Sequence, residues 1–328
     1  MADTHCDTLM APEFREHLIQ LPPTPAGARL DSVLAQALPQ YSRSRLAGWI
    51  KDGKVTVDGR LPRTRDLVYG GEKVALRAEL PADQSVQPQK MPLDILYEDE
   101  DLLVLNKPVG LVVHPGAGNP SNTLQNALLA YDARLALVPR AGIVHRIDKD
   151  TSGLLVVAKT IESHAALVEM LREHSVHRDY LALVVGRVTG GGTVDTPIGR
   201  HRSDRLKMTV RADGRAAVTH YRVVERFHNH TLLRISLETG RTHQIRVHMA
   251  HIGHPLAGDP AYGGRRQLTA GEDPAVRAAL VAFKRQALHA TRLAFEHPQT
   301  GEEIAVEAPP PRDMLALLAV LRTAAGPG

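Results

Sequence analysis

The sequence of 328 residues contains one cysteine, Cys6, and only 4% aromatic residues. A single cysteine cannot form a disulfide within the chain, and it excludes a metal site built from several thiolates. No apolar run approaches the roughly 20 residues of a membrane-spanning helix. The first residues also lack the basic and apolar regions of a signal peptide. We therefore expect a cytoplasmic protein that makes no membrane contact.

The chain also lacks the sequence patterns that bind common cofactors. It has no Gly-rich phosphate loop and no dinucleotide-binding fingerprint. His243, His248, His251 and His254 suggest zinc, but the first two are five residues apart, whereas ligands on one helix face are four apart. We expect neither a metal nor a cofactor. The net charge of +4 says little about nucleic acid, so the position of the charges matters more.

Two domains are predicted from the pattern along the chain. Helical spacing of apolar residues runs from Arg29 to Leu38, and a second helix is expected to begin after Ser42 as its N-cap. Short strands are expected at 55–57 and 74–76. The predicted organisation is a flexible tail at 1–20, a small domain at 21–80, a linker at 81–91, a large domain at 92–312, and a C-terminal helix and tail at 313–328.

The large domain has the pattern of an α+β fold. Leu154–Ala158 is a continuous apolar run, which is typical of a buried central strand. Strands expected at 95–97 and 102–105 flank an acidic turn, and further strands are expected at 181–185, 219–224 and 231–237. Because strands follow one another in pairs with few helices between them, we expect a mixed, largely antiparallel sheet.

Three tracts carry polar residues that are unusual for their surroundings. Residues 145–153 place cations and carboxylates in a loop directly before the buried strand, where catalytic groups often lie. Residues 238–248 turn at Gly240 into a predicted helix, and Tyr180 opens a strand. Taken singly, the first tract is as consistent with a surface turn, and Tyr180 with an aromatic residue at the rim of a site.

Together, these tracts resemble the RluA/RluD family of ribosomal-RNA pseudouridine synthases, from about Arg29 to Pro310. The His-Arg-x-Asp-x-x-Thr-Ser-Gly motif is matched by residues 145–153 and the Gly-Arg-x-His-Gln-x-Arg motif by residues 240–246. Residues 106–116 and 258–263 are similar to two further motifs, and residues 29–31 and 42–45 resemble an S4 RNA-binding module. The arrangement is most similar to the RluD branch, which modifies large-subunit rRNA.

The resemblance implies a pseudouridine synthase fold with a small α/β S4-like domain, and isomerisation of uridine by base flipping. Asp148 matches the catalytic carboxylate, which adds either to the base or to the sugar. Arg246 matches the arginine paired with it. Tyr180 matches the active-site tyrosine, which can stack on uracil and whose hydroxyl could help to remove the C5 proton. Arg146 matches the arginine that fills the space left by the base, with a phosphate contact as the alternative.

Other residues are expected to support the site or to bind RNA. Active-site support is expected from His145, Arg241, His243 and Gln244. RNA contacts are expected from Arg43, Arg45, Lys51, Lys54, Lys107, Arg178, Arg200, Arg202, Arg205 and Lys207. The expected partner is 23S ribosomal RNA or a precursor of the large ribosomal subunit, bound by a monomer. A tRNA pseudouridine synthase, or a non-catalytic RNA-binding factor for ribosome assembly, are the alternatives.

Overall fold

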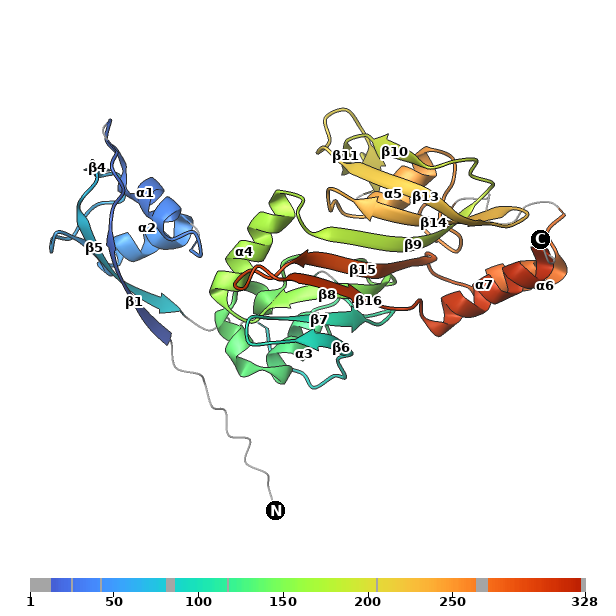
Figure 1. Ribbon diagram of the computed structural model, residues 1–328, viewed down its shortest axis with the longest axis horizontal. Coiled ribbons are helices and arrows are strands. Elements are labelled where there is room, and N and C mark those ends of the chain that lie inside the picture. The colour runs from blue at the N-terminus through green and yellow to red at the C-terminus, as the bar shows by residue number, and fades with distance from the viewer. Residues whose placement is uncertain are drawn as a thin grey trace, which may run out of the picture.

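The computed structural model of the chain describes residues 13–24, 26–41, 43–80, 86–116, 118–204, 206–263 and 271–325. It contains a small N-terminal domain and a larger domain (Figure 1). Several predictions fall outside the described residues: the first twelve residues of the tail, the N-cap Ser42, the linker residues 81–85, the RNA contact Arg205 and the last three residues of the C-terminal tail.

The small domain combines two helices with short strands. Its elements are β1 (Glu13–Gln20), β2 (Ala28–Arg29), α1 (Leu30–Ala37), α2 (Arg43–Lys51), β3 (Val55–Val57), β4 (Leu67–Val68) and β5 (Lys73–Leu80). Leu30 and Leu34 of α1 and Leu46 and Trp49 of α2 are buried against the sheet of order β1-β5-β3. The predicted helices and the predicted strand at 55–57 are therefore confirmed, and the strand predicted at 74–76 extends to 73–80.

Residues 13–20 are not part of a tail, so this prediction is wrong. They form β1, which pairs antiparallel with β5 along its full length, from Glu13 opposite Leu80 to Gln20 opposite Lys73. The sequence pattern hides this strand because its outer face carries apolar Leu18, which is 85% exposed. Its other face carries polar His17, which hydrogen-bonds Tyr41 at 2.9 Å.

The large domain is built on one twisted sheet (Figure 1). Among the described residues it has nine strands, in the order β10-β13-β14-β9-β15-β8-β7-β6 with β16 beside β15. All neighbours pair antiparallel except β15 and β8, so the predicted mixed, largely antiparallel sheet is confirmed. The strands are β6 (Ile95–Glu98), β7 (Leu102–Lys107), β8 (Ser152–Ala158), β9 (His177–Val185), β10 (Gly192–Asp195), β13 (Val218–Arg226), β14 (His230–Leu237), β15 (Leu288–Glu296) and β16 (Glu303–Glu307).

Helices and a small hairpin surround this sheet. The helices are α3 (Leu124–Tyr131), α4 (Ile161–Arg172), α5 (Gln244–His251), α6 (Pro274–Ala282) and α7 (Arg312–Ala325), with short 3-10 helices at Ala133–Leu137 and Pro139–Gly142. The hairpin pairs β11 (Ile198–Arg200) with β12 (Met208–Val210). Every residue of β8 is buried, as predicted for a central strand. No described helix is long and apolar enough to cross a membrane.

Two predicted boundaries of the large domain need correction. Residues 86–91, assigned to the linker, are packed on α3: the Gln89 N–H donates to the Asn126 carbonyl at 2.9 Å, and the Asn126 amide donates to the Gln87 carbonyl at 2.7 Å. The helix expected after residue 313 is α7, and its buried Met314 and Leu318 pack in one core cluster with α6. Both segments belong to the large domain.

The role of β1 can be tested with Trp49, the single tryptophan of the chain. Removal of residues 1–20 deletes β1 and leaves β5 as an open edge. Because each backbone hydrogen bond contributes about 1 kcal/mol net, the free energy of unfolding of the small domain should fall by several kcal/mol. Urea unfolding followed by Trp49 fluorescence measures this. Removal of residues 1–12 alone is the control, and equal midpoints for the two truncations would contradict the assignment.

Candidate active site

The candidate site lies where the loop before β8, strand β9 and helix α5 meet. A pocket at this point brings together the three residues predicted to act in catalysis, Asp148, Tyr180 and Arg246. The residues that line it are Arg146, Ile147, Asp148, Thr151, Arg178, Tyr180, Leu237, Gly240, Arg241, Thr242, His243, Gln244, Ile245, Arg246 and Leu288.

The loop that carries Asp148 is fixed from several sides. The side chain of Ile147 is buried in the core, and the N–H of Thr151 donates to the Asp148 carbonyl at 3.1 Å to close the turn. The N–H of Gly110 donates to the Lys149 carbonyl at 2.9 Å. Backbone held in this way leaves the Asp148 side chain, 16% exposed, directed into the pocket.

Lys107 was expected to contact RNA, and the structure contradicts this because the residue has no exposed surface. Its ammonium group donates instead to the carbonyl oxygens of Pro108 at 2.7 Å and Lys149 at 3.0 Å. Burial lowers the pKa of Lys107 to about 7, although Asp150 and Asp148 work in the opposite direction. Lys107 therefore supports the backbone of the loop that carries Asp148 from the buried side of that loop.

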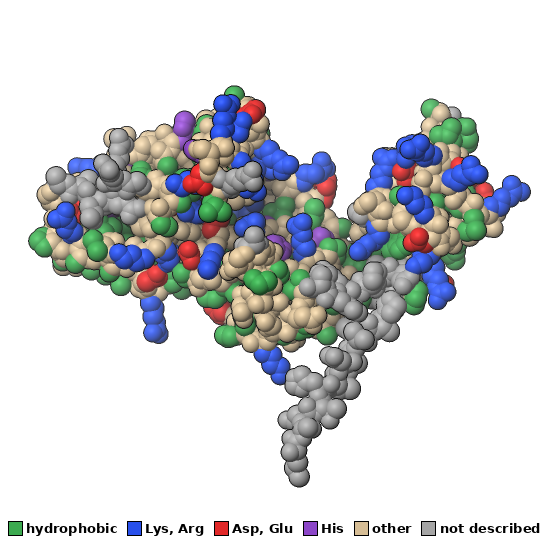
Figure 2. Space-filling model, turned by 180° about the vertical axis from the view of Figure 1, so that it is seen from behind, with side chains coloured by type: hydrophobic (Ala, Val, Ile, Leu, Met, Phe, Trp, Pro, Cys, Tyr) green, Lys and Arg blue, Asp and Glu red, His purple; other side chains and the backbone are tan. Residues whose placement is uncertain are grey.

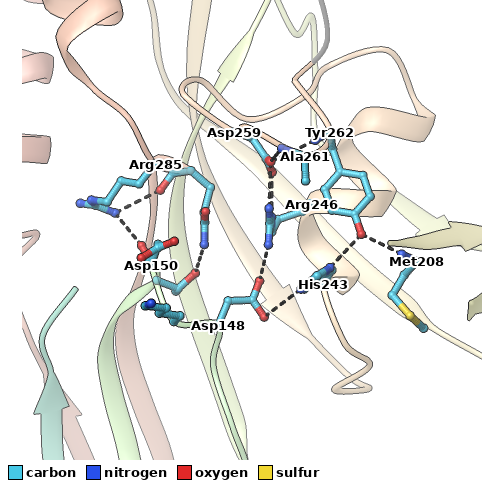
Figure 3. Close-up of polar contacts among 12 residues, drawn as sticks. Asp148, Asp150, Met208, His243, Arg246, Asp259, Ala261, Tyr262 and Arg285 are labelled. Atoms are coloured by element: carbon cyan, nitrogen blue, oxygen red, sulfur yellow. Dashed lines mark hydrogen bonds and ion pairs between the residues drawn. The ribbon is translucent and has the colours of Figure 1, made fainter. Parts of the chain in front are cut away.

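Arg285 also supports this loop, and no motif or pattern in the sequence predicted its role. Its guanidinium donates to the Asp150 carbonyl at 3.2 Å, two residues from Asp148 (Figure 3). The same guanidinium pairs with Asp313 at the start of α7, with distances of 2.7 and 2.9 Å. The C-terminal helix is thus joined to the active-site loop through one arginine.

A buried arginine holds the Asp148 carboxylate in place. Arg246 donates from Nη1 to Asp148 Oδ2 at 3.0 Å, and from Nε and Nη2 to the two carboxylate oxygens of Asp259 at 2.7 and 2.9 Å (Figure 3). Burial acts to lower the pKa of Arg246, but the two carboxylates outweigh it and raise the pKa. The guanidinium therefore stays charged, and it can pair with both carboxylates at once.

Asp259 pairs with Arg246 and was not singled out from the sequence, although it lies in the motif at 258–263. It is completely buried, and besides Arg246 it accepts hydrogen bonds from the N–H groups of Ala261 and Tyr262 at 2.9 and 3.0 Å. The preceding Gly258 has a φ of +72°, and a Cβ there would lie 2.2 Å from the Arg285 carbonyl. Only glycine fits this turn.

The second oxygen of Asp148 faces a histidine. His243 Nε2 lies 3.9 Å from Asp148 Oδ1, which is too long for a hydrogen bond. The other ring nitrogen, Nδ1, lies 2.8 Å from the Tyr262 hydroxyl oxygen. Figure 3 shows His243 between the carboxylate and Tyr262. Burial lowers the pKa of His243, Asp148 and Asp259 act to raise it, and Arg246 and Arg146 act to lower it.

Tyr180 forms one wall of the pocket from β9 and is only 6% exposed. Burial raises the pKa of its hydroxyl, Arg178 opposes the shift, and Asp148 adds to it, so the phenol is protonated at neutral pH. Arg178, expected at an RNA surface, lies in the pocket wall and is 7% exposed. It donates to the Glu238 carbonyl at 2.9 Å, and its buried Nε has no hydrogen-bond partner.

The four residues expected to support the site, and Arg146, have different positions. Gln244 is buried and holds the turn at Gly240 by accepting from the Arg241 N–H at 2.9 Å. Arg241 donates to the Ala216 carbonyl at 3.0 Å. His145 accepts from the Val156 N–H at 3.1 Å, and burial lowers its pKa to about 3, so it is neutral. Arg146 is exposed at the rim of the pocket.

A second, larger groove continues from the pocket and shares Arg146, Arg178 and Arg241 with it. Arg140 and Arg172 also line it, whereas none of its described lining residues is a carboxylate. The lining residues are Val86, His114, Pro115, Gln125, Arg140, Ile143, Val144, His145, Arg146, Val168, Leu171, Arg172, Arg178, Gly240 and Arg241. Such a groove matches a polyanion.

Other cations lie on the surface. Figure 2 shows Lys and Arg side chains spread over the small domain and over part of the large one. On the small domain, Arg43 pairs with the buried carboxylate of Asp31 at 2.9 Å, so part of its charge is used within the fold. The remaining predicted contacts are exposed or half-buried: Arg45, Lys51, Lys54, Arg200, Arg202 and Lys207.

The histidines that suggested zinc have separate partners. His248 is buried between Thr219 and the Thr196 carbonyl, at 2.9 and 3.0 Å, and His254 contacts the Val185 carbonyl at 3.0 Å. Within the described chain, one group of potential metal ligands lies elsewhere: Asp99, Asp101 and His297. His297 Nδ1 accepts from the N–H groups of Gln299 and Thr300, so its Nε2–H faces Asp99 as a donor.

Comparison with known proteins gives matches along most of the chain. Residues 101–251 match the RNA pseudouridylate synthase family, and residues 28–61 match the S4 domain. The chain is 56% identical over 302 residues to the ribosomal large subunit pseudouridine synthase D of Xanthomonas campestris, covering 92% of this chain and 91% of that protein. The protein of the same name from Escherichia coli K12 is 54% identical, over 90% of this chain and 91% of its own length.

Two solved structures share this fold. Human RNA pseudouridylate synthase domain containing 4 superposes with a TM-score of 0.55 at 27% identity, over 70% of this chain and 92% of that chain. Human RNA pseudouridylate synthase domain containing 1 superposes with a TM-score of 0.51 at 26% identity, over 68% of this chain and 86% of that chain.

The buried position of Lys107 predicts a dependence of stability on pH. Its pKa is about 7 in the folded protein and near its ordinary 10.5 in the unfolded chain. Between these values the unfolded state binds more protons, so the free energy of unfolding should rise with pH, by up to about 1.4 kcal/mol per pH unit. Urea unfolding at pH 7, 8 and 9 should show this rise relative to Lys107→Met. A difference between the two proteins that does not change with pH would contradict the assignment.

Proposed function

The chain belongs to the RNA pseudouridylate synthase family, and on this basis we propose that it isomerises specific uridines of large-subunit ribosomal RNA to pseudouridine. The observation that carries the proposal is Asp148 paired with buried Arg246 in a chain that is 56% identical to a synthase named for the large ribosomal subunit. No described residue favours tRNA as the substrate or a non-catalytic role. We further propose that the protein acts as a monomer in the cytoplasm.

The pocket offers a nucleophile and an aromatic wall for the isomerisation. The N1–C1′ bond must break, the base must rotate, and a C5–C1′ bond must form. The bond formed to Asp148 is then broken, C5 loses its proton to water, and N1 takes up a proton, so that uridine and pseudouridine have the same atoms. Asp148 Oδ2 is held by Arg246, which leaves Oδ1 to act as the nucleophile, on the base or on the sugar. Tyr180 offers its ring for stacking and its protonated hydroxyl beside the reacting base.

The target base must leave its helix to reach Asp148, at a cost of a few kcal/mol. Arg146 stands exposed at the pocket rim, in a position to occupy the space that the base vacates. The groove lined by Arg140, Arg172 and Arg241 offers a path for the flanking phosphates. The small domain offers further cations for more distant RNA.

The proposal is tested by incubating the purified protein with transcripts of 23S ribosomal RNA and of tRNA. Release of the C5 proton as tritium from labelled uridine measures turnover, and mapping of the product identifies the uridines. Pseudouridine in the 23S transcript supports the proposal. Activity on tRNA alone, or on neither RNA, would overturn it.

We predict that Asp148→Asn abolishes turnover while the affinity for RNA stays within about tenfold, or 1.4 kcal/mol. The amide keeps the shape of the side chain but removes the nucleophile and the negative charge. Asp150→Asn is the matched control, because it makes the same change two residues away. Substantial tritium release by Asp148→Asn would exclude Asp148 as the nucleophile.

The division of labour between the domains gives a separate prediction. A chain beginning at Val86 loses the small domain but keeps Gln87 and Gln89, which are bonded to α3. Its affinity should fall, and it should fall less steeply with salt than that of the full chain, because fewer counterions are released. Turnover at saturating RNA should change much less. Loss of saturated turnover with an intact circular dichroism spectrum would mean that the small domain does more than bind RNA.

A further inference from the structure

Two hydrogen bonds and one longer polar contact run from the β11–β12 hairpin to Asp148. The backbone N–H of Met208, the first residue of β12, donates to the Tyr262 hydroxyl at 2.8 Å. The same hydroxyl lies 2.8 Å from Nδ1 of His243, whose Nε2 faces Asp148 Oδ1 at 3.9 Å. Figure 3 shows these four residues in sequence. Of these four residues, only Asp148 has a role in the isomerisation proposed above.

The Met208 N–H makes the Tyr262 hydroxyl an acceptor on one side, and in one of the two neutral tautomers of His243 the hydroxyl is the donor on the other. A backbone N–H can only donate, so Tyr262 Oη is the acceptor from Met208 and has its own proton left to give. It can give that proton to His243 Nδ1, which must then be unprotonated. A neutral imidazole with a bare Nδ1 carries its proton on Nε2. That N–H points toward the oxygen of Asp148 that Arg246 does not hold.

Packing ties the hairpin to the same place. Met208 and Val210 of β12 and the ring of Tyr262 pack with Val247 of α5 in one small apolar cluster. The Tyr262 ring also lies 5.0 Å from the Arg246 guanidinium. Movement of β12 would therefore shift Tyr262, and with it both partners of the catalytic carboxylate.

The loop that joins β11 to β12 is cationic and faces solvent. Arg200, which pairs with Met208 across the hairpin, and Arg202 are exposed, and the Lys207 side chain is 40% exposed beside Asp204. Exposed cations on this loop match the phosphates of RNA. The cationic loop thus directly adjoins Met208, the residue that is bonded to Tyr262.

We propose that Tyr262 and His243 are positioning residues that couple docking of the β11–β12 hairpin on RNA to the orientation of Asp148. The hairpin fixes Tyr262 through the Met208 N–H, and Tyr262 fixes the tautomer of His243. The Nε2–H of His243 then faces Asp148 Oδ1 across 3.9 Å, where its dipole favours one orientation of that oxygen without a hydrogen bond. The inference rests on the proposed function and adds to it a link between substrate binding and catalysis.

The backbone at His243 supports this role. His243 precedes α5 with a φ of +57°, in the left-handed region, which is strained for a residue other than glycine. Strain of this kind persists where the surrounding structure fixes a side chain in one place. The charged and titratable groups around the ring are Asp148, Arg246, Asp259, Arg146 and Tyr262.

The contacts from Met208 through Tyr262 and His243 to Asp148 are called the relay below. Tyr262→Phe tests the relay because it keeps the ring on Arg246 and removes only the hydroxyl. At saturating 23S transcript, kcat should fall by about tenfold, since the tautomer of His243 is no longer fixed, while KM stays within about twofold. Tyr131→Phe is the matched control: its hydroxyl bonds Glu98 on the surface, away from the site. A kcat for Tyr262→Phe equal to that of Tyr131→Phe would overturn the proposal.

The pH profile of kcat separates a positioning role from general damage to the fold. A hydrogen bond donated to Nδ1 stabilises neutral His243, so its removal should raise the pKa of His243. The acid limb of kcat should therefore move to higher pH in Tyr262→Phe. In His243→Gln, whose amide can donate from a similar position but does not titrate, this limb should disappear while most of kcat remains. An unchanged acid limb in both variants would overturn the relay.

The link to the hairpin is tested by comparing Met208→Pro with Met208→Ala. Both variants lose the side chain, and only proline lacks the N–H that bonds Tyr262. Met208→Pro should lower kcat further than Met208→Ala, and it should add nothing in a Tyr262→Phe background. Additive losses would show that the hairpin acts by another route. If the wild-type chain forms no pseudouridine, the proposed function fails; the relay fails only where the wild-type chain is active.

Discussion

The site depends on one buried cation. Arg246 has almost no contact with solvent, and its charge is balanced by Asp259 on one side and by Asp148 on the other. Removing one member of such a set leaves an uncompensated charge in the interior, which costs several kcal/mol. Asp259, bound through both oxygens, therefore balances the guanidinium within the protein, and one oxygen of Asp148 has no hydrogen bond to Arg246. The carboxylate proposed to act in catalysis thus has a second, buried carboxylate as its structural counterpart.

The sheet brings these groups together from distant parts of the sequence. Asp148 precedes β8 and Tyr180 lies on β9, and both strands are neighbours of β15. Arg246 reaches the same point from α5. Lys107 and Arg285 donate hydrogen bonds to carbonyl oxygens of the loop that carries Asp148. These donors take the place of the water molecules that the carbonyl oxygens would otherwise bind. The position of the Asp148 side chain is therefore fixed by the contacts of the backbone around it.

Much of the fold and of the site could be predicted from the sequence. The apolar run of β8 and the motifs around Asp148 and Arg246 identify a central strand and its catalytic loop. β1 was missed because its inner face is polar at His17 and its outer face apolar at Leu18, the reverse of the usual pattern. Lys107 was misassigned because a lysine in a motif carries no sign of its burial. Its partners are backbone carbonyl oxygens, whose positions cannot be predicted from composition or periodicity.

The position of β15 has a consequence for the order in which the protein can form. This strand lies between β8 and β9 in the sheet, yet it begins at Leu288, long after both of them in the chain. On a ribosome the two halves of the sheet can fold as hairpins, but they cannot join until β15 emerges. Because such long-range pairing is slow, the nascent chain holds an open sheet edge until then. The pocket around Asp148, which Leu288 also lines, is completed only after β15 has been synthesised.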